Sequence, residues 1–417
     1  MKTFINLIFL LLLPGFLVAQ QAVTMKKCWQ KAYDNMPAIK QKAILIKLDS
    51  LEQVILRNNY LPEINVNAQV GWQSDVVGVD IDLPMINIDK PSKDQYKAFL
   101  EINQLIWDGG RTKAMRKKSN IEISLLQAQT EEAFYEVKKH VSSLYFGLIL
   151  SQKQIRLTKK LIATLKEKME EINSAVHQGV VREANYNVLK VEKLSVEQQL
   201  TEQQKQTSSI ISMLNVITGM NIRINDSLII PEPKIPENCQ RQKLTVFELQ
   251  KKSFDAGNLL LKKNRMPVFN AFAQAGYGKP GLNMLKTEAD SWFMSGARVA
   301  WNIFDRNTNK YQRKKLVYSQ QMIDYQKEQF LQQVDIMSQQ YINDIEKYEI
   351  LVMRDKEIID LRQKITEDYN SRLKQGTVTS SAYVDELFKE SAACITKEIH
   401  AIKLIQSQIN LQIIMEK

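Results

Sequence analysis

The sequence predicts a mainly α-helical protein with a small β part, and three patterns support that fold class. A heptad repeat of apolar residues continues for about 70 residues without a proline, which predicts one very long helix. Four short segments instead alternate apolar and polar residues, which is the period of a β-strand. Both patterns occur twice along the chain, so we expect two copies of one structural unit.

The first long helix is expected between Asp108 and Gly179, where apolar residues recur at alternating spacings of three and four. Only Ser151 and Thr158 interrupt this seam, and both are small. At 1.5 Å per residue the helix would be about 100 Å long, so neighbouring helices must support it along its length. The seam residues are Phe134, Val137, Val141, Leu144, Leu148, Ile155, Ile162, Leu165, Met169, Ile172 and Val176.

A second copy of this helix is expected between Asp305 and Gly376, because both residues lie 197 positions after their counterparts Asp108 and Gly179. Its seam is less regular, with Asp355 and Arg362 at positions where apolar residues are expected. The repeats are therefore expected at residues 21–218 and 241–417. Residues 219–240 contain three prolines and are expected to form a linker between them.

The remaining segments follow the same order in both repeats. Strands are expected at residues 64–72 and 96–106 in the first repeat, and at 269–277 and 292–303 in the second. Shorter helices are expected at 23–58, with Pro37 interrupting it, at 182–217, at 241–264, and from Thr379 or Ser380 to the C-terminus. Each repeat thus reads helix, strand, loop, strand, very long helix, turn and helix.

The composition favours a structural or transport role over catalysis. The formal net charge is +11, but lysines and arginines alternate with Glu and Gln along the helices, which favours solvated helix faces over nucleic-acid binding. Three isolated cysteines and three isolated histidines form no recognisable metal site, and no catalytic or nucleotide-binding motif occurs. We therefore expect no enzyme activity, no cofactor, no metal and no nucleic-acid partner.

Residues 1–20 have the parts of a secretory signal peptide: one Lys, an apolar run, Pro14-Gly15, and a small residue at Ala19. We expect cleavage near Ala19 or Gln20. A membrane anchor is the alternative, but the run is short for a membrane span and Pro14-Gly15 breaks it. Export from the cytoplasm is the prediction.

Alternating strands in an exported protein fit a transmembrane barrel, and they also fit a soluble sheet with one wet face. Four strands cannot close a barrel, and an open sheet edge in lipid leaves backbone groups without hydrogen bonds. If the sheet lies in a membrane, several chains must therefore share one barrel.

With these features the chain resembles the TolC-like outer-membrane efflux proteins. The resemblance covers nearly all of the mature chain and rests on the order and spacing of several weak motifs. They are the duplication, the turn Trp107-Asp108-Gly109-Gly110-Arg111, its second version Phe304-Asp305-Arg306-Asn307, and the segment Gly376-Thr377-Val378-Thr379.

The resemblance implies a homotrimer whose twelve strands form one β-barrel in the outer membrane, in contact with outer-membrane lipid. The long hairpins would continue as an α-barrel across the periplasm, with residues 219–240 as an equatorial belt around it. The protein would be a passive duct for efflux or type I secretion. Its partners would be a periplasmic adaptor (membrane fusion protein) and an inner-membrane pump of the RND, ABC or MFS type.

The resemblance also implies site residues. The strand-to-helix turns are Asp108, Gly109, Gly110 and Asp305, and the hairpin tips, where an adaptor docks, are Gly179, Val180, Gly376, Thr377, Val378 and Thr379. The family often carries aspartates six and nine residues after each tip glycine, as a ring at the entrance. Here those positions hold Asn185, Val188, Ala382 and Asp385, so the entrance candidates are Asp385, the adjacent Glu386 and Asn185. The alternative is that Asp385 and Glu386 are solvated helix residues.

A different class of function also fits long helical hairpins, namely a periplasmic coiled-coil adaptor or scaffold. Such a protein would normally need several more strands in small β domains, and it would not need two hairpins 197 residues apart. Extraction from the membrane separates the two hypotheses, because a duct fractionates with the outer membrane.

Overall fold

The computed structural model describes residues 22–76, 92–283 and 286–416, so the signal peptide expected at 1–20 lies outside the described residues. Two helices of 67 residues each dominate the chain: α3 (Arg111–His177) and α6 (Thr308–Lys374). The mainly helical fold class with a small β part is confirmed. The other helices are α1 (Met25–Asn35), α2 (Pro37–Asn58), α4 (Glu183–Thr218), α5 (Gln242–Lys263) and α7 (Ser380–Met415).

Several element ends differ by a few residues from the sequence expectation, and local contacts explain three of them. The long helices begin three residues after Asp108 and Asp305, because both carboxylates accept backbone N–H groups of the first helical turn from outside the helix. Strand β4 ends at Ala300 rather than at residue 303. Its partner strand starts at Val268, and Pro267 before it has no N–H group to extend the ladder.

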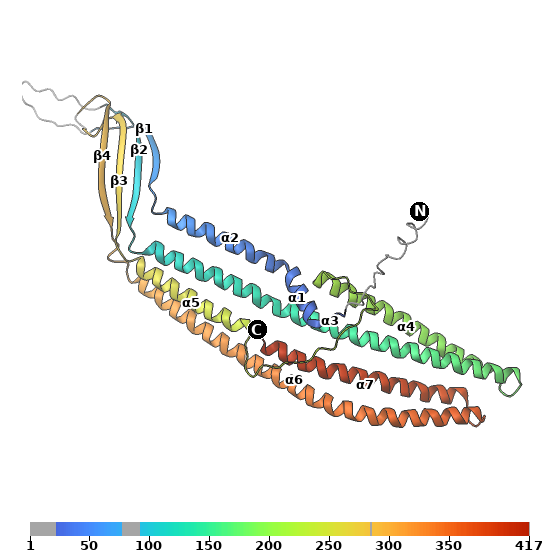
Figure 1. Cartoon of the computed structure of the whole chain (residues 1–417). Helices are drawn as coiled ribbons and strands as arrows, with labels where there is room; N and C mark the ends of the chain where they lie inside the picture. Colours follow the sequence, from blue (N-terminus) through green and yellow to red (C-terminus); the bar gives the residue numbers. More distant parts are fainter. Residues whose placement is uncertain (1–21, 77–91, 284–285, 417) are drawn as a thin grey trace, which may run out of the picture. The chain divides into compact units, whose positions relative to one another are not determined.

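The four strands form one antiparallel sheet in the order β1–β2–β3–β4 (Figure 1). They are β1 (Glu63–Trp72), β2 (Asp94–Trp107), β3 (Val268–Lys279) and β4 (Asp290–Ala300). One row across the sheet pairs Val66, Leu100, Ala275 and Phe293. The two inner strands come from different repeats, so the pairing of β2 with β3 joins the repeats, and β1 and β4 are left as the edges.

The chain folds into two compact units, and each takes segments from both repeats. The sheet unit comprises Gln41–Gln129 and Lys243–Glu328 and holds the four strands. The helical unit comprises Thr130–Gln242, Gln329–Lys417 and the N-terminal residues up to Lys40. The compact units therefore do not coincide with the sequence repeats.

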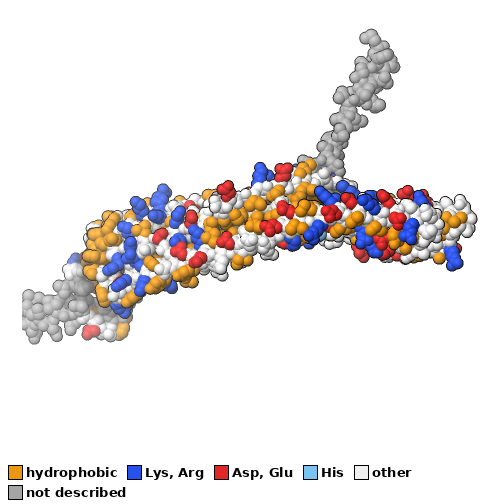
Figure 2. Space-filling view, turned by 90° about the horizontal axis from the view of Figure 1, so that it is seen from below, with side chains coloured by type: hydrophobic (Ala, Val, Ile, Leu, Met, Phe, Trp, Pro, Cys, Tyr) orange, Lys and Arg blue, Asp and Glu red, His pale blue; other side chains and the backbone are white. Residues whose placement is uncertain are grey.

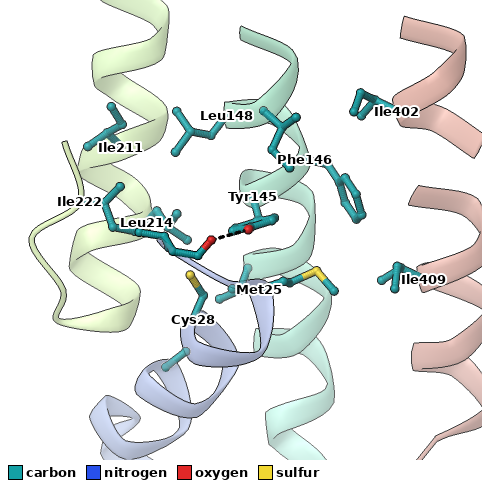
Figure 3. Packing of buried hydrophobic residues seen from close by; sticks show 14 of the residues in the cluster. Met25, Cys28, Tyr145, Phe146, Leu148, Ile211, Leu214, Ile222, Ile402 and Ile409 are labelled. Carbon is teal, nitrogen blue, oxygen red and sulfur yellow. Dashed lines mark hydrogen bonds between the residues drawn. The ribbon is translucent and has the colours of Figure 1, made fainter. Parts of the chain in front are cut away.

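The centre of the helical unit is an apolar cluster from α1, α3, α4 and α7 (Figure 3). Its Tyr145 is fully buried on α3, and the single hydroxyl hydrogen is shared between the carbonyl oxygens of Val23 and Ile229, each 2.7 Å from the hydroxyl oxygen. Burial raises the pKa of the Tyr145 hydroxyl, which therefore stays protonated as a donor. This one side chain fixes both the N-terminal segment and the linker expected at 219–240 to α3.

A second apolar cluster lies toward the hairpin tips and joins the two hairpins. It contains the fully buried Leu165 and Leu189 of the first hairpin together with Leu373 and Tyr383 of the second. Because each tip contributes residues to the same cluster, the two tips are held side by side within the helical unit.

Candidate functional site

The sheet has one apolar and one polar face, as the period-two pattern predicts. Val66, Val70 and Phe293 lie on the apolar face, with exposed fractions of 79%, 86% and 66%. The polar face carries Asn and Gln side chains. On it the Gln274 amide donates a hydrogen bond of 2.7 Å to the Glu101 carboxylate. An apolar sheet face left this exposed requires an apolar surrounding or a partner.

The polar face also carries an aromatic group that the sequence pattern does not reveal. Phe99 of β2 and Trp292 of β4 are both paired with Gly276 of β3, one from each side, and their ring centroids are 5.6 Å apart. They meet above Gly276 of β3, where a β-carbon would lie 2.6 Å from the Cβ of Phe99. Glycine at 276 is thus required by the close approach of two side chains from other strands.

The first strand-to-helix turn is organised by Asp108. Its carboxylate accepts hydrogen bonds from the Tyr60 hydroxyl (2.7 Å) and from the backbone N–H groups of Gly110 (2.9 Å) and Thr112 (2.5 Å). Burial acts to raise the pKa of Asp108, but these hydrogen bonds outweigh it and lower the pKa below its ordinary value. Gly109 has φ 68°, and a β-carbon there would lie 2.1 Å from the Cβ of Met266.

The second strand-to-helix turn uses different residues for the same backbone path. Arg306 and Asn307 take φ values of 55° and 64°, at the positions of Gly109 and Gly110. The Asp305 carboxylate accepts the N–H of Asn309 at 3.0 Å. The turn is therefore preserved between the repeats, although two residues with side chains adopt the left-handed conformation in the second.

Both hairpin tips end their first helix with the same Schellman turn. Gly179 has φ 77° and Gly376 has φ 73°. The N–H of Gly179 donates to the Val176 carbonyl and the N–H of Val180 to the Ala175 carbonyl, at 2.9 and 3.0 Å. Gly376 and Thr377 repeat both bonds 197 residues later. Glycine at these two positions is explained by the positive φ that this turn needs.

The return helices start differently. Thr379 caps α7 by accepting the N–H of Ala382 at 3.2 Å, whereas Arg182, its counterpart before α4, makes no side-chain cap. Val180 at the first tip is 74% exposed and its counterpart at the second is the exposed Thr377, whereas Val181 and Val378 both pack against the shared cluster. The tips therefore have the same backbone and different surfaces.

The three entrance candidates occupy different environments. The Asp385 side chain is 64% exposed and pairs with Lys389 at 2.6 Å. The Glu386 side chain is 12% exposed and pairs with Arg362 at 3.0 Å and with Lys389 at 2.8 Å. Asn185 lies in the first turn of α4 and is half-buried. Only Asp385 of the two acids presents its carboxylate to solvent.

The irregular seam residues of the second hairpin find partners on its return helix. Asp355 pairs with His400 at 2.7 Å, and Arg362 pairs with Glu386. The same positions of the first hairpin hold neutral pairs: the Thr158 hydroxyl donates to Gln203 at 3.0 Å, and Leu165 faces Leu189 within one apolar cluster. Ionisable pairs therefore replace neutral ones at two matched levels of the second hairpin.

The matching family model is that of the outer membrane efflux proteins, and it covers residues 29–219. Solved outer-membrane channels match the rest of the fold as well. CmeC from Campylobacter jejuni has 13% identity and a TM-score of 0.67, covering 94% of this chain and 85% of its own. The open-state MtrE channel from Neisseria gonorrhoeae has 14% identity and a TM-score of 0.67, covering 94% and 88%. The family match covers just under half of the chain, and the solved channels show that nearly all of the chain has their fold.

VceC, an outer membrane protein from Vibrio cholerae, has 13% identity and a TM-score of 0.64, and the match covers 94% of each chain. None of the curated proteins compared with the chain matches it. Among the described residues, no helix has a stretch both long and apolar enough to span a membrane. The same residues hold no group of three or more potential metal ligands.

Proposed function

We propose that this protein belongs to the outer membrane efflux family and is the outer-membrane channel of a tripartite efflux or type I secretion system. It would act as a homotrimer and a passive duct, receiving substrates through a periplasmic adaptor from an inner-membrane pump. The observation that carries this proposal is the four-stranded sheet, whose apolar face is exposed and whose edge strands are β1 and β4.

Backbone groups on an open edge in lipid have no water to bind, so each edge must pair with another strand. Single-chain barrels begin at about eight strands, and four are too few to close. Three copies joined edge to edge, β1 of one chain beside β4 of the next, would give the twelve-stranded barrel that the resemblance implies. The polar face, with Glu101 and Gln274, would then line a water-filled lumen.

The hairpin tips are proposed as the periplasmic entrance and the adaptor-docking surface. The exposed Val180 is the apolar contact offered by the first tip. At the entrance, Asp385 is the acid that three chains would bring toward one axis, because Glu386 is already held by Arg362. We further propose the boundaries 21–218, 219–240 and 241–417 for the repeats and linker, and that the chain has no enzyme activity or cofactor of its own.

The deciding experiment fractionates outer from inner membranes and measures the mass of the detergent-solubilised protein complex. A complex of three chains in the outer-membrane fraction supports the channel. A soluble monomer or dimer refutes it and favours the periplasmic adaptor or scaffold, because four strands alone cannot satisfy a membrane.

A matched pair of variants tests which face of the sheet meets lipid. Val66→Lys places a charge on the apolar face, and a cation near the bilayer midplane costs about 2–4 kcal/mol in a barrel. We expect this variant to lose trimer from the outer membrane. Asn67→Lys, one residue along on the polar face, is the control and should assemble normally. Equal loss in both variants would contradict the assignment of faces.

A further inference from the structure

Positive charge is concentrated where the strands of the sheet unit meet its helices. Three segments, residues 108–118, 262–266 and 305–315, contain thirteen basic residues and two acidic ones, Asp108 and Asp305. We call the thirteen the basic collar. They are Arg111, Lys113, Arg116, Lys117, Lys118, Lys262, Lys263, Arg265, Arg306, Lys310, Arg313, Lys314 and Lys315.

The collar accounts for the whole charge excess of the protein. Removing its thirteen basic residues and the two aspartates from the 57 basic and 46 acidic residues of the sequence leaves 44 of each. Elsewhere the alternation of signs along the helices therefore balances, as expected for solvated faces. Figure 2 shows Lys and Arg side chains gathered beside hydrophobic side chains toward the left of the view.

The described residues supply little negative charge to this collar. Within the described part of the chain, Lys118 is the one member with a carboxylate within ion-pair distance, that of Glu122 at 3.2 Å. The two aspartates are occupied as caps, since both accept N–H groups of the helix starts. Neither α3 nor α6 has an acidic residue in its first turn. The collar cations at the starts of α3 and α6 also face the positive ends of those helix dipoles, which is unfavourable without an external anion, whereas Lys262 and Lys263 lie at the favourable C-terminal end of α5.

The neighbouring end of the sheet has the character of a membrane boundary. Trp107, Trp301 and Phe304 are exposed by 44%, 58% and 79%, and they lie within a few residues of the strand ends. The Trp301 indole donates to the Arg265 carbonyl at 3.0 Å, which ties this aromatic belt to the collar. Aromatic side chains gather at the level of lipid headgroups in outer-membrane barrels.

We propose that the basic collar binds the phosphate groups of anionic phospholipids in the membrane leaflet nearest the helices. The inference rests on the proposed function, because it needs the sheet to lie in a membrane. The order along the molecule fits a lipid: acyl chains against the apolar sheet face, the boundary at the aromatic belt, and the phosphate at the collar. Residues 111–118 span about 10 Å of helix, comparable to the headgroup region.

The test measures lipid retention by the full-length, detergent-purified complex, using native mass spectrometry with phosphatidylglycerol and phosphatidylcholine. The collar variant carries Lys113→Gln, Lys117→Gln, Lys310→Gln and Lys315→Gln, all at exposed positions. The control carries Lys159→Gln, Lys190→Gln, Lys205→Gln and Lys356→Gln, which are also exposed and lie in the helical unit. Both variants lose four positive charges, so only the position of the charge differs.

We expect the wild type and the control to prefer phosphatidylglycerol, and the collar variant to lose about fivefold in affinity for each removed cation that contacts headgroups. The preference should also weaken as salt is raised. An equal loss in the control would overturn the proposal, because general charge would then explain it. No preference in the wild type would overturn it as well.

A competitor identifies the source of the phosphate. Soluble glycerol 3-phosphate at millimolar concentration should displace little phosphatidylglycerol, because it lacks acyl chains to contact the sheet. Full displacement would assign the collar to soluble anions passing through the channel and refute a lipid site. A trimer in the outer membrane without lipid preference would contradict this inference alone, whereas absence from that membrane would contradict the proposed function.

Discussion

The paired substitution Arg362→Leu with Glu386→Leu should stabilise the second hairpin, although each single substitution should destabilise it. The first hairpin shows the reason, because the corresponding residues 197 positions earlier are Leu165 and Leu189, both fully buried. The two partners of the ion pair differ in their exposure to solvent: the Glu386 side chain is 12% exposed and the Arg362 side chain is 36% exposed. A charged group that is buried to this extent loses much of its hydration.

The magnitudes follow from what each variant leaves behind. Breaking a fully buried ion pair typically costs about 3–5 kcal/mol. Here Lys389 still pairs with Glu386 and Arg362 is partly solvated, so each single substitution should cost only about 1–2 kcal/mol. Replacing both charges with leucine removes the desolvation cost and adds apolar burial, and such replacements often stabilise by about 1–4 kcal/mol. The two substitutions should therefore be strongly coupled.

The assay is thermal unfolding of the four proteins of this double-mutant cycle in the same detergent, followed by helical circular dichroism. The control is a second cycle on Arg372 and Asp368, an exposed pair at 3.7 Å, which should show coupling below about 1 kcal/mol. A double variant less stable than the wild type would refute the reasoning. It would mean that the second hairpin is shaped for the ion pair and cannot pack two leucines.

Three further predictions concern the turns and the core. Tyr145→Phe should cost about 1–2 kcal/mol of unfolding free energy, since the Ile229 carbonyl loses the hydroxyl and the Val23 carbonyl keeps only the N–H of Ile229, and limited proteolysis should then cleave residues 219–240 faster. Gly109→Ala should destabilise the sheet unit by about 2 kcal/mol or more in a thermal melt, because a β-carbon meets Met266 at positive φ. Arg306→Ala at the equivalent position should change little, and equal effects would contradict this account. Hydrogen bonds lower the pKa of Asp108 in the folded protein. The ionised carboxylate therefore stabilises the fold fully above the unfolded pKa of about 3.9, and this stabilisation is lost as the pH falls through the lower, folded pKa. The stability difference between wild type and Asp108→Asn should therefore shrink below about pH 4, and a constant difference would contradict this.

The sequence determines most elements of this protein, because helices and strands leave local periods that need no knowledge of distant residues. The apolar seam predicts one long helix between Asp108 and Gly179, and α3 begins and ends within three residues of these two positions. The alternation in β1 to β4 likewise predicts which face of the sheet is apolar. Gly179 and Gly376 mark the tips, since a Schellman turn depends on a few consecutive residues.

What only the tertiary structure decides are the contacts between residues far apart in the chain. Asp355 and Arg362 look like defects in an apolar seam until His400 and Glu386 are placed opposite them. Gly276 looks like a weak strand residue until Phe99 and Trp292 meet above it from two other strands. A local period reports the face on which a side chain lies. The partner on that face is set by the packing of another element, which no period in the sequence encodes.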